Sequence, residues 1–221
     1  MHTLIITKEH VARVLTPEAA NHAVEQAFVA YGLGQVDMPA KSYLNFPKGD
    51  LRSMPSYIHG QSLDIAAIKS VTVHPGNRKG GLPTVMAVVV LVDPDTGFPL
   101  AIMDGTYLTS MRTGAAGALA AKLLSREQST TAGFVGSGIQ ARTQLDCTMR
   151  VRPLTRVTVW EHRPGSQTTA DFMDWARNAH GLEVTSSPDI DQVTTGVDIL
   201  VTTTPAEKPL VRRVSPGTHV N

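Results

Sequence analysis

Hydrophobic positions in the first half of the chain follow the pattern of β-strands. Two runs rich in β-branched residues, 66–73 and 84–92, predict strands. The segment Asp-Pro-Asp-Thr-Gly at 93–97 is a turn sequence, and it joins the second run to a further apolar run at 98–103. Because the turn is short, the strands on either side of it are expected to form a hairpin.

One helix is expected before these strands. Thr16 can act as its N-cap, and Pro17 suits the first helical position because its missing N–H would have had no partner there. A glycine, Gly32 or Gly34, is suited to end the helix. The apolar residues that recur at helical spacing between these limits are Ala20, Val24, Ala27, Phe28 and Tyr31.

Beyond about residue 104, strand-like runs alternate with helix-like segments. A helix at 106–124 has unusually small residues at its centre, and because a helical glycine costs about 1 kcal/mol against alanine, another element is expected to approach there. The following segments are predicted in turn: strand 132–135, helix 139–150, strand 157–161, helix 167–180, a short strand near 182–184, strand 198–203 and a strand start at 219. Such alternation predicts a parallel sheet and an α/β fold.

A glycine-rich turn between the strand at 132–135 and the helix at 139–150 carries the clearest functional signal. Its spacing, Gly136-x-Gly138-x-x-Ala141, fits the dinucleotide-binding pattern G-x-G-x-x-G/A in the required strand-to-helix context. The helix start offers unpaired N–H groups and a positive dipole end to a pyrophosphate. The alternative is a glycine turn without a ligand. The predicted cofactor-binding residues of the turn are Gly136, Ser137, Gly138, Ile139, Gln140 and Ala141.

Composition excludes several classes of protein. The chain has 221 residues, 42% hydrophobic and 18% charged, with a formal net charge of +1, and no block of like charge suggests binding to nucleic acid or a membrane surface. No apolar stretch is long enough to span a bilayer, and the N-terminus lacks the features of a signal peptide. The single cysteine, Cys147, fits a reducing compartment. We expect a cytoplasmic protein and assign no metal site.

Two later strand ends extend the predicted cofactor site. Glu161 lies a little over 20 residues beyond the glycine turn, where a carboxylate accepts hydrogen bonds from the adenosine ribose of NAD, although a solvated carboxylate is the alternative. His162 and Arg163 follow Glu161, and they leave NADP as an alternative cofactor because a cation attracts its 2′-phosphate. Thr203 and Thr204 lie at the end of another strand. Their hydroxyls either contact the nicotinamide ribose or only stabilise a local turn.

Four cations near glycine or proline turns are candidates for a substrate site: Lys41, Arg52, Lys69 and Arg112. Lys69 lies inside an apolar strand, so it either points to solvent or is held by an anion, because burying it unpaired is costly. Arg112 lies near the start of a helix, where the helix dipole disfavours a cation. Lys41 and Arg52 taken singly would be read as surface residues.

Several motifs in their order and spacing resemble the ornithine cyclodeaminase/mu-crystallin family, and most closely its archaeal-type alanine dehydrogenase branch. The resemblance covers nearly the whole chain. It implies a substrate-binding and dimerisation domain of the α+β class at 1–112, a Rossmann NAD-binding domain at 113–221 that is incomplete at its C-terminal end, and a homodimer. The motifs are Met38-Pro-Ala-Lys41, Arg52-Ser-Met54-Pro55, Ile68-Lys69-Ser-Val, His74-Pro-Gly-Asn, Gly81-Leu-Pro-Thr84, Met103-Asp-Gly-Thr106 and Met111-Arg112-Thr-Gly-Ala-Ala116.

The resemblance also implies roles for individual residues. Lys41, Lys69 and Arg112 match pocket residues of the family, with Lys41 or Lys69 as the catalytic proton shuttle, and Thr84 matches a hydroxyl of the same site. Arg52 stands where ornithine cyclodeaminases look acidic, which disfavours a second amine on the substrate. Arg52 and Arg112 would hold the substrate carboxylate by charge-assisted hydrogen bonds. The expected reaction is NAD-dependent oxidative deamination of a small L-amino acid to its 2-oxo acid and ammonia.

Four alternatives to this reaction stay open. Within the family they are ornithine cyclodeaminase, which converts L-ornithine to L-proline and ammonia, and an imine reductase. From another class they are a non-catalytic, crystallin-like binding protein or an inactive fragment. The family's catalytic aspartate lies just after the stretch that matches Thr218-His-Val-Asn221, so we expect this chain to be a fragment that neither folds well nor turns over alone.

Overall fold

The computed structural model describes residues 2–60 and 63–221. The chain forms two compact units, the first made of Met1–Thr16 with His22–Thr109 and the second of Pro17–Asn21 with Ser110–Asn221. Helices α2 (Pro17–Gly32) and α3 (Thr106–Leu124) each contribute residues to both units. None of the described helices is long and apolar enough to cross a membrane.

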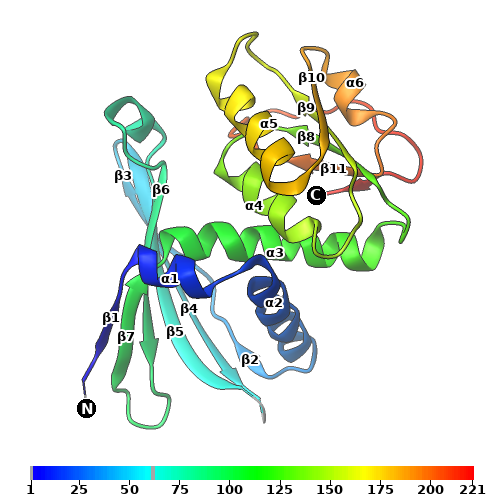
Figure 1. The fold of residues 1–221 in the computed structure, drawn as a ribbon. Coiled ribbons are helices and arrows are strands. Elements are labelled where there is room, and N and C mark those ends of the chain that lie inside the picture. The colour runs from blue at the N-terminus through cyan, green and yellow to red at the C-terminus, as the bar shows by residue number, and fades with distance from the viewer. Residues whose placement is uncertain (1, 61–62) are drawn as a thin grey trace. The chain divides into compact units, whose positions relative to one another are not determined.

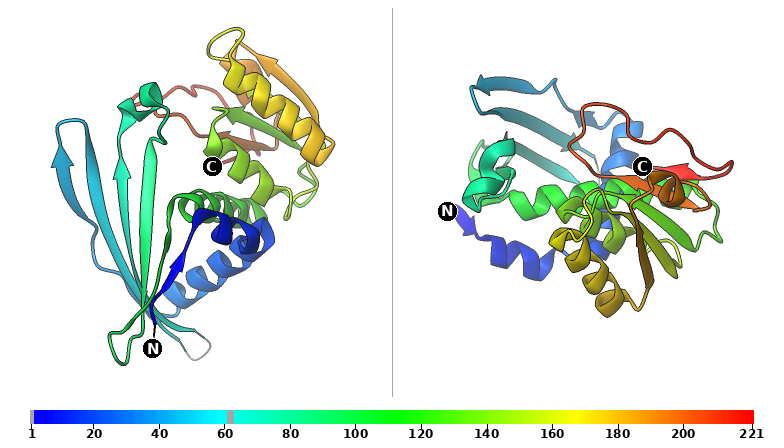
Figure 2. Two further views of the ribbon diagram at one scale, coloured as in Figure 1. Left: turned by 60° about the vertical axis from the view of Figure 1, so that its left-hand side comes forward. Right: turned by 90° about the horizontal axis from the view of Figure 1, so that it is seen from above.

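The first unit contains a seven-stranded sheet in the order β1-β7-β6-β5-β4-β2, with β3 also paired to β4 (Figure 1, Figure 2). All of its pairings are antiparallel except the parallel pair β1–β7. The predicted hairpin is confirmed as β6 and β7. The strands are β1 (Leu4–Ile6), β2 (Val36–Asp37), β3 (Ser42–Phe46), β4 (Gly49–His59), β5 (Asp64–Val73), β6 (Val85–Val92) and β7 (Pro99–Asp104).

The two faces of this sheet differ in exposure. Residues directly opposite each other in an antiparallel pair share a face, so the register places Val71, Ala87, Val89 and Ala101 on one face. All four are buried. The other face carries exposed apolar side chains from four strands: Ile5, Leu44, Phe46, Val88, Leu100 and Ile102.

Two helices and a 3₁₀ turn complete the first half of the chain. Helix α1 (Lys8–Val14) starts at the N-cap Thr7, the 3₁₀ turn spans Pro75–Gly80, and α2 begins at Pro17 as predicted. Helical spacing predicted more apolar residues on the buried face of α2 than the structure shows. The residues that α2 buries most deeply are small ones, such as Ala20 and Ala30. The larger Phe28 and Tyr31 are exposed.

The second unit contains a five-stranded parallel sheet in the order β10-β9-β8-β11-β12, which confirms the predicted α/β class (Figure 1). Helix α6 (Ile190–Thr194) was not predicted. The other elements after α3 are β8 (Thr131–Val135), α4 (Ile139–Thr148), β9 (Arg156–Trp160), α5 (Gln167–His180), β10 (Glu183–Ser187), β11 (Ile199–Thr202) and β12 (His219–Val220).

Apolar clusters cover both faces of the parallel sheet. On one face, Phe134 and Ile199 pack with Leu145 of α4 and Phe172 of α5. On the other, Val135 and Leu200 belong to a smaller cluster that includes Val193 of α6. Consecutive residues of β8 and β11 therefore point to opposite, buried faces, which explains why these strands are almost continuously apolar.

The small centre of α3 allows α4 to approach closely. A Cβ on Gly114 would overlap the carbonyl group of Thr143, and one on Gly117 would overlap the side chain of Gln144. The expectation of a close neighbour at these glycines is confirmed. This contact sets α4, the helix that follows the glycine turn, against the preceding helix.

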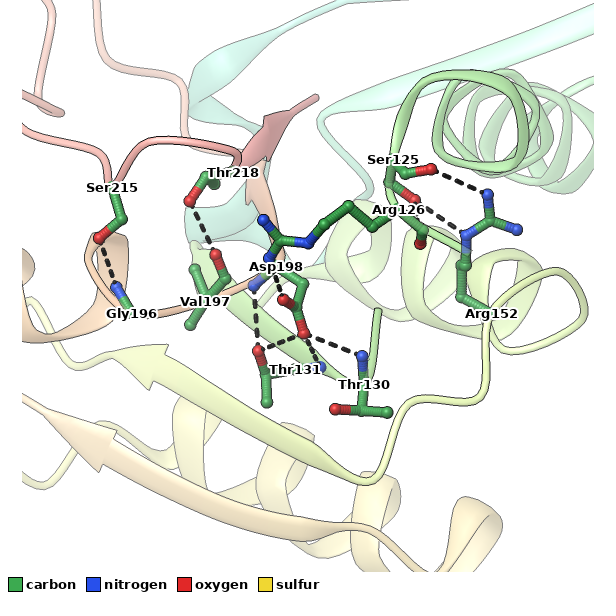
Figure 3. Close-up of polar contacts among 10 residues, drawn as sticks. All are labelled: Ser125, Arg126, Thr130, Thr131, Arg152, Gly196, Val197, Asp198, Ser215 and Thr218. Atoms are coloured by element: carbon green, nitrogen blue, oxygen red, sulfur yellow. Dashed lines mark hydrogen bonds and ion pairs between the residues drawn. The ribbon is translucent and has the colours of Figure 1, made fainter. Parts of the chain in front are cut away.

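A polar network closes the end of the sheet at which β8 and β11 begin (Figure 3). Asp198 accepts hydrogen bonds from the N–H groups of Thr130 at 2.9 Å and Thr131 at 3.0 Å, and it pairs with Arg126. The side chain of Arg152 is buried next to this network, and its Nε donates to Ser125 Oγ at 2.9 Å. These contacts tie the end of α3 to two neighbouring strands.

Candidate functional site: a glycine turn on the parallel sheet and a charged sheet face

The candidate cofactor site lies where the order of the parallel strands reverses. Strands β8 and β11 are neighbours, with Val135 paired to Thr202 at their carboxyl ends, while the chain continues outward to β9 on one side and β12 on the other. In open parallel sheets, ligands bind outside the carboxyl ends at such a switch point. The glycine turn follows β8 directly, so the fold places it at this position.

The geometry explains each small residue of the turn. Gly136 has φ +121°, which disfavours any side chain, and a Cβ there would lie 2.6 Å from Thr203 Oγ1. Gly138 is the N-cap of α4 and supplies no side-chain cap, which leaves the first N–H groups of the helix without a side-chain acceptor. Ala141 is fully buried, as close packing of helix on strand requires.

The other residues of the turn point in different directions. Ser137 Oγ lies 3.1 Å from Thr169 Oγ1 on α5, which anchors the turn to a second helix. Ile139 is the first residue of α4, and its side chain is 61% exposed. Within the described residues, the buried Gln140 Oε1 atom has no hydrogen-bond partner.

Thr203 and Thr204 lie beside the glycine turn. The Thr203 N–H donates to Val135 O at 2.9 Å, and its Oγ1 is buried without a hydrogen-bond partner in the described part of the chain. Thr204 lines a cavity of about 360 Å³ together with Val135, Thr202, Glu207, Lys208 and Leu210. A buried hydroxyl without a partner, next to a turn that excludes side chains, fits a polar ligand at this edge.

Glu161 follows β9 at the same edge of the sheet. Its Oε1 accepts from the Gly165 N–H at 2.9 Å, and its Oε2 lies 3.5 Å from Ser186 Oγ. His162 is exposed with its ring 4.8 Å from that of Trp160, and Arg163 is exposed beside it. The carboxylate is therefore held at the edge by the neighbouring loop, with two basic residues next to it.

Four of the five predicted substrate residues belong to the first unit. Lys41 is exposed just before β3, and Thr84 is half-buried just before β6. Arg52 on β4 is opposite Val71, and Lys69, two residues from Val71 on β5, is opposite Met54. Arg52 and Lys69 are therefore diagonal neighbours on the sheet face that also carries the buried core residues, roughly 7–8 Å apart.

Arg52 is paired with a carboxylate that the sequence analysis did not single out. Arg52 Nε donates to Asp50 Oδ1 at 2.7 Å, and Nη2 donates to Oδ2 at 3.0 Å. The hydrogen bonds from Arg52 hold the pKa of Asp50 below its usual value, and Asp50 raises the pKa of Arg52. The spacing of two residues along a strand was the available signal, since it puts both side chains on one face.

Arg112, the fifth residue, lies on α3 in the second unit. Its guanidinium makes no hydrogen bond or ion pair with the residues that the structure describes, and desolvation lowers its pKa. Because an arginine stays charged at neutral pH even so, Arg112 is a cation with donors available to an anion.

Two other kinds of chemistry find no support in the described residues. No three His, Cys, Asp or Glu side chains gather there as potential metal ligands. Cys147 is fully buried, and desolvation raises the pKa of its thiol to about 12, so it is not a reactive thiolate.

Comparisons with known proteins identify the family of the chain. The model of the ornithine cyclodeaminase/mu-crystallin family matches residues 1–221. Alanine dehydrogenase of Archaeoglobus fulgidus is 45% identical over 223 residues, which cover 100% of this chain and 66% of that protein. The chain thus spans about two thirds of the length of this relative.

Solved structures show the same relationship. An archaeal alanine dehydrogenase dimer with bound NAD has a TM-score of 0.92 and 44% identity, covering 100% of this chain and 67% of that one. The Thermococcus litoralis Δ1-pyrroline-2-carboxylate reductase in complex with NADH and L-proline has a TM-score of 0.94 and 33% identity. The match covers 99% of this chain and 68% of that one. This chain belongs to the ornithine cyclodeaminase/mu-crystallin family.

Proposed function

We propose that this protein is an NAD-dependent oxidoreductase that deaminates a small neutral L-amino acid, most like alanine, to its 2-oxo acid and ammonia. The observation that carries the cofactor part is the glycine turn at the strand-order reversal, with Gly136 at φ +121° beside the unpartnered hydroxyl of Thr203. The similarity to an NAD-bound alanine dehydrogenase supports it.

The residues at the sheet edge are suited to hold a dinucleotide. The N–H groups at the start of α4 would receive the pyrophosphate, and Thr203 would donate to the polar part of the ligand near the turn. Glu161 would accept hydrogen bonds from the adenosine ribose, which favours NAD because its charge opposes a 2′-phosphate. NAD, when bound, accepts a hydride from the substrate Cα.

The charged sheet face is suited to hold the amino acid. The Arg52 guanidinium would bind the substrate carboxylate, with each charge-assisted hydrogen bond contributing about 1.5–3 kcal/mol. Lys69, on the same face, or Lys41 would move protons to and from the amino group and the attacking water. Thr84 is a further proposed contact in the same unit, and Arg112 of the second unit is proposed separately as a cation available to an anion. Arg52 carries the substrate preference, since a basic residue opposes a second ammonium group on the ligand.

The experiment is a coupled assay of the purified protein with NAD⁺ and either L-alanine or L-ornithine. Accumulation of NADH with L-alanine supports the proposal. Proline and ammonia formed from L-ornithine without net NADH would instead identify a cyclodeaminase. Binding of NAD⁺ with turnover of no amino or imino acid would identify a binding protein.

Reduction of a cyclic imine is a second candidate function. It is favoured by the similarity to a reductase that was crystallised with NADH and L-proline, at a TM-score of 0.94. The same cations would hold the carboxylate of a cyclic imino acid. Oxidation of NADH on addition of Δ1-pyrroline-2-carboxylate, at a higher kcat/KM than with pyruvate and ammonia, would favour this reaction.

We also propose that the exposed apolar face of the antiparallel sheet binds a second copy of the chain. Val88 is 46% exposed and Ile102 is 38% exposed on this face, and a shallow apolar cavity of about 340 Å³ lined in part by Pro55, Tyr57 and Ile68 lies on it as well. Contiguous apolar patches of this kind mark association surfaces. The solved relative with the same fold is a dimer, which supports a homodimer here.

A further inference from the structure

The Arg52 guanidinium is restrained by two neighbours on its own sheet face. Asp50 accepts two hydrogen bonds along the Nε–Nη2 edge of the guanidinium, from Nε to Oδ1 at 2.7 Å and from Nη2 to Oδ2 at 3.0 Å. The Tyr43 ring, directly opposite Arg52 on β3, lies under the guanidinium carbon at 5.5 Å from the ring centre. The Tyr43 ring therefore restrains the plane of the guanidinium, and the two hydrogen bonds to Asp50 restrain its rotation within that plane.

The donors that remain are arranged for one kind of ligand. A guanidinium has five N–H donors, and Asp50 uses two of them, so three remain, two on Nη1 and one on Nη2. One donor from each of these nitrogens forms the end-on fork, which matches the two oxygens of a carboxylate. The Asp50 contact leaves this fork complete.

We propose that Asp50 is a positioning residue for the substrate carboxylate: it fixes Arg52 so that the Nη1–Nη2 edge receives the ligand. This inference rests on the proposed role of Arg52. The pairing is consistent with the electrostatics, since Arg52 lowers the pKa of Asp50 and keeps it ionised. A side chain held in its binding geometry before the ligand arrives loses less conformational freedom on binding.

An opposite effect makes the proposal testable. The Asp50 carboxylate also repels an incoming carboxylate, and its two hydrogen bonds occupy guanidinium donors that are then closed to a ligand. If repulsion dominated, removing the charge of Asp50 would tighten binding. If positioning dominates, the same change weakens binding, so the two readings differ in sign.

The experiment titrates the NAD⁺-saturated protein with pyruvate and compares wild type with Asp50→Asn, Asp50→Glu and Arg52→Ala. Asp95→Asn is the matched control, because Asp95 is exposed in the turn after β6. We expect Asp50→Asn to raise the Kd for pyruvate by about 3- to 10-fold, with Asp50→Glu between it and wild type. The Kd for NAD⁺ and the circular dichroism spectrum stay unchanged, which a general loss of structure would not allow.

The outcomes separate this inference from the proposed reaction. If Arg52→Ala abolishes pyruvate binding while Asp50→Asn binds as tightly as wild type or more tightly, the positioning role is wrong. If wild type and Arg52→Ala both fail to bind pyruvate, the carboxylate site and the positioning role are wrong together. If Asp50→Asn weakens pyruvate binding but L-alanine gives no NADH, the positioning role stands and the proposed reaction fails.

Discussion

Asp198 and Thr131 are joined by reciprocal hydrogen bonds where two neighbouring parallel strands begin, Thr131 being the first residue of β8 and Asp198 the residue just before β11. The Thr131 N–H and Oγ1 both donate to Asp198 Oδ2, at 3.0 and 2.9 Å, and the Asp198 N–H donates back to Thr131 Oγ1 at 3.0 Å. The same strands, β8 and β11, carry the glycine turn and Thr203 at their other ends. The contact therefore fixes the register of the pair that forms the candidate cofactor site.

Replacing Asp198 with asparagine should destabilise the second unit. Asn keeps one acceptor oxygen but loses the charge that pairs with Arg126 and receives the Thr130 and Thr131 N–H groups. Loss of charge-assisted hydrogen bonds predicts a decrease of about 1–3 kcal/mol in the free energy of unfolding, measured by urea titration. The control is Asp174→Asn, whose carboxylate is 70% exposed in a surface pair and should change stability by less than about 0.5 kcal/mol.

The same carboxylate predicts how stability depends on pH. Desolvation alone raises the pKa of Asp198, but hydrogen bonds from Thr130, Arg126 and Thr131 outweigh it and lower the pKa to about 2, against 3.8 for an unperturbed carboxyl. A depressed pKa contributes stability above pH 4 that is lost as the pH falls from about 4 to about 2. Thermal unfolding of wild type and Asp198→Asn should show a difference in Tm at pH 6 that shrinks below pH 4. A difference that stays constant to pH 2 would contradict this assignment.

Replacing Gly136 with alanine should abolish dinucleotide binding. The substitution forces a Cβ into a positive-φ position and to 2.6 Å from Thr203 Oγ1, so the turn must shift away from β11. Gly181→Ala is the matched control, because Gly181 also has a positive φ, 66°, but has open space where its Cβ would lie. Both variants should lose about 1–3 kcal/mol of stability from backbone strain. Only Gly136→Ala should raise the Kd for NADH, by at least about tenfold, in a fluorescence titration.

Most elements of the parallel sheet were predictable because local signals agreed with tertiary packing. Helix 167–180 was placed correctly, and the structure adds that Gly181 ends it in the left-handed conformation. The glycines in the centre of α3 predicted a close neighbour, though only the structure identifies it as α4. Helix α6 was missed, as was strand β1 of the other sheet, since five and three residues are too few to show a period.

The candidate site was predictable where a motif fixes the backbone and less so where charges pair. Gly136 and Gly138 stand where the motif requires them, at the switch point of the sheet. The Asp50–Arg52 pair was not predicted, although both residues alternate onto one face of β4, because a sequence does not show which partner a charged side chain selects. The role of Asp198 in joining β8 to β11 was likewise not predicted, since its partners lie 67 and 72 residues away in the sequence.

Replacing Glu161 with glutamine should weaken the preference for NAD. The carboxylate lies at the end of β9 beside His162 and Arg163, so removing its charge leaves a basic surface for a 2′-phosphate. The ratio of the Kd for NADPH to the Kd for NADH should fall by about tenfold, or about 1.4 kcal/mol, in parallel titrations. Glu183→Gln, at the opposite end of the neighbouring strand β10, should leave the ratio unchanged. An unchanged ratio in Glu161→Gln would remove Glu161 from the ribose site.

Replacing Val88 with aspartate should disrupt the proposed homodimer. Val88 is 46% exposed in the apolar face made by β1, β3, β6 and β7, so in a dimer an aspartate there would be buried without a partner. Sedimentation velocity should show wild type as a dimer and Val88→Asp as a monomer, with the dimer weakened on the order of 100-fold. Val14→Asp is the control, since Val14 is 77% exposed on α1 and lies off the sheet. A dimer that survives Val88→Asp but not Val14→Asp would move the interface from the sheet to the helix.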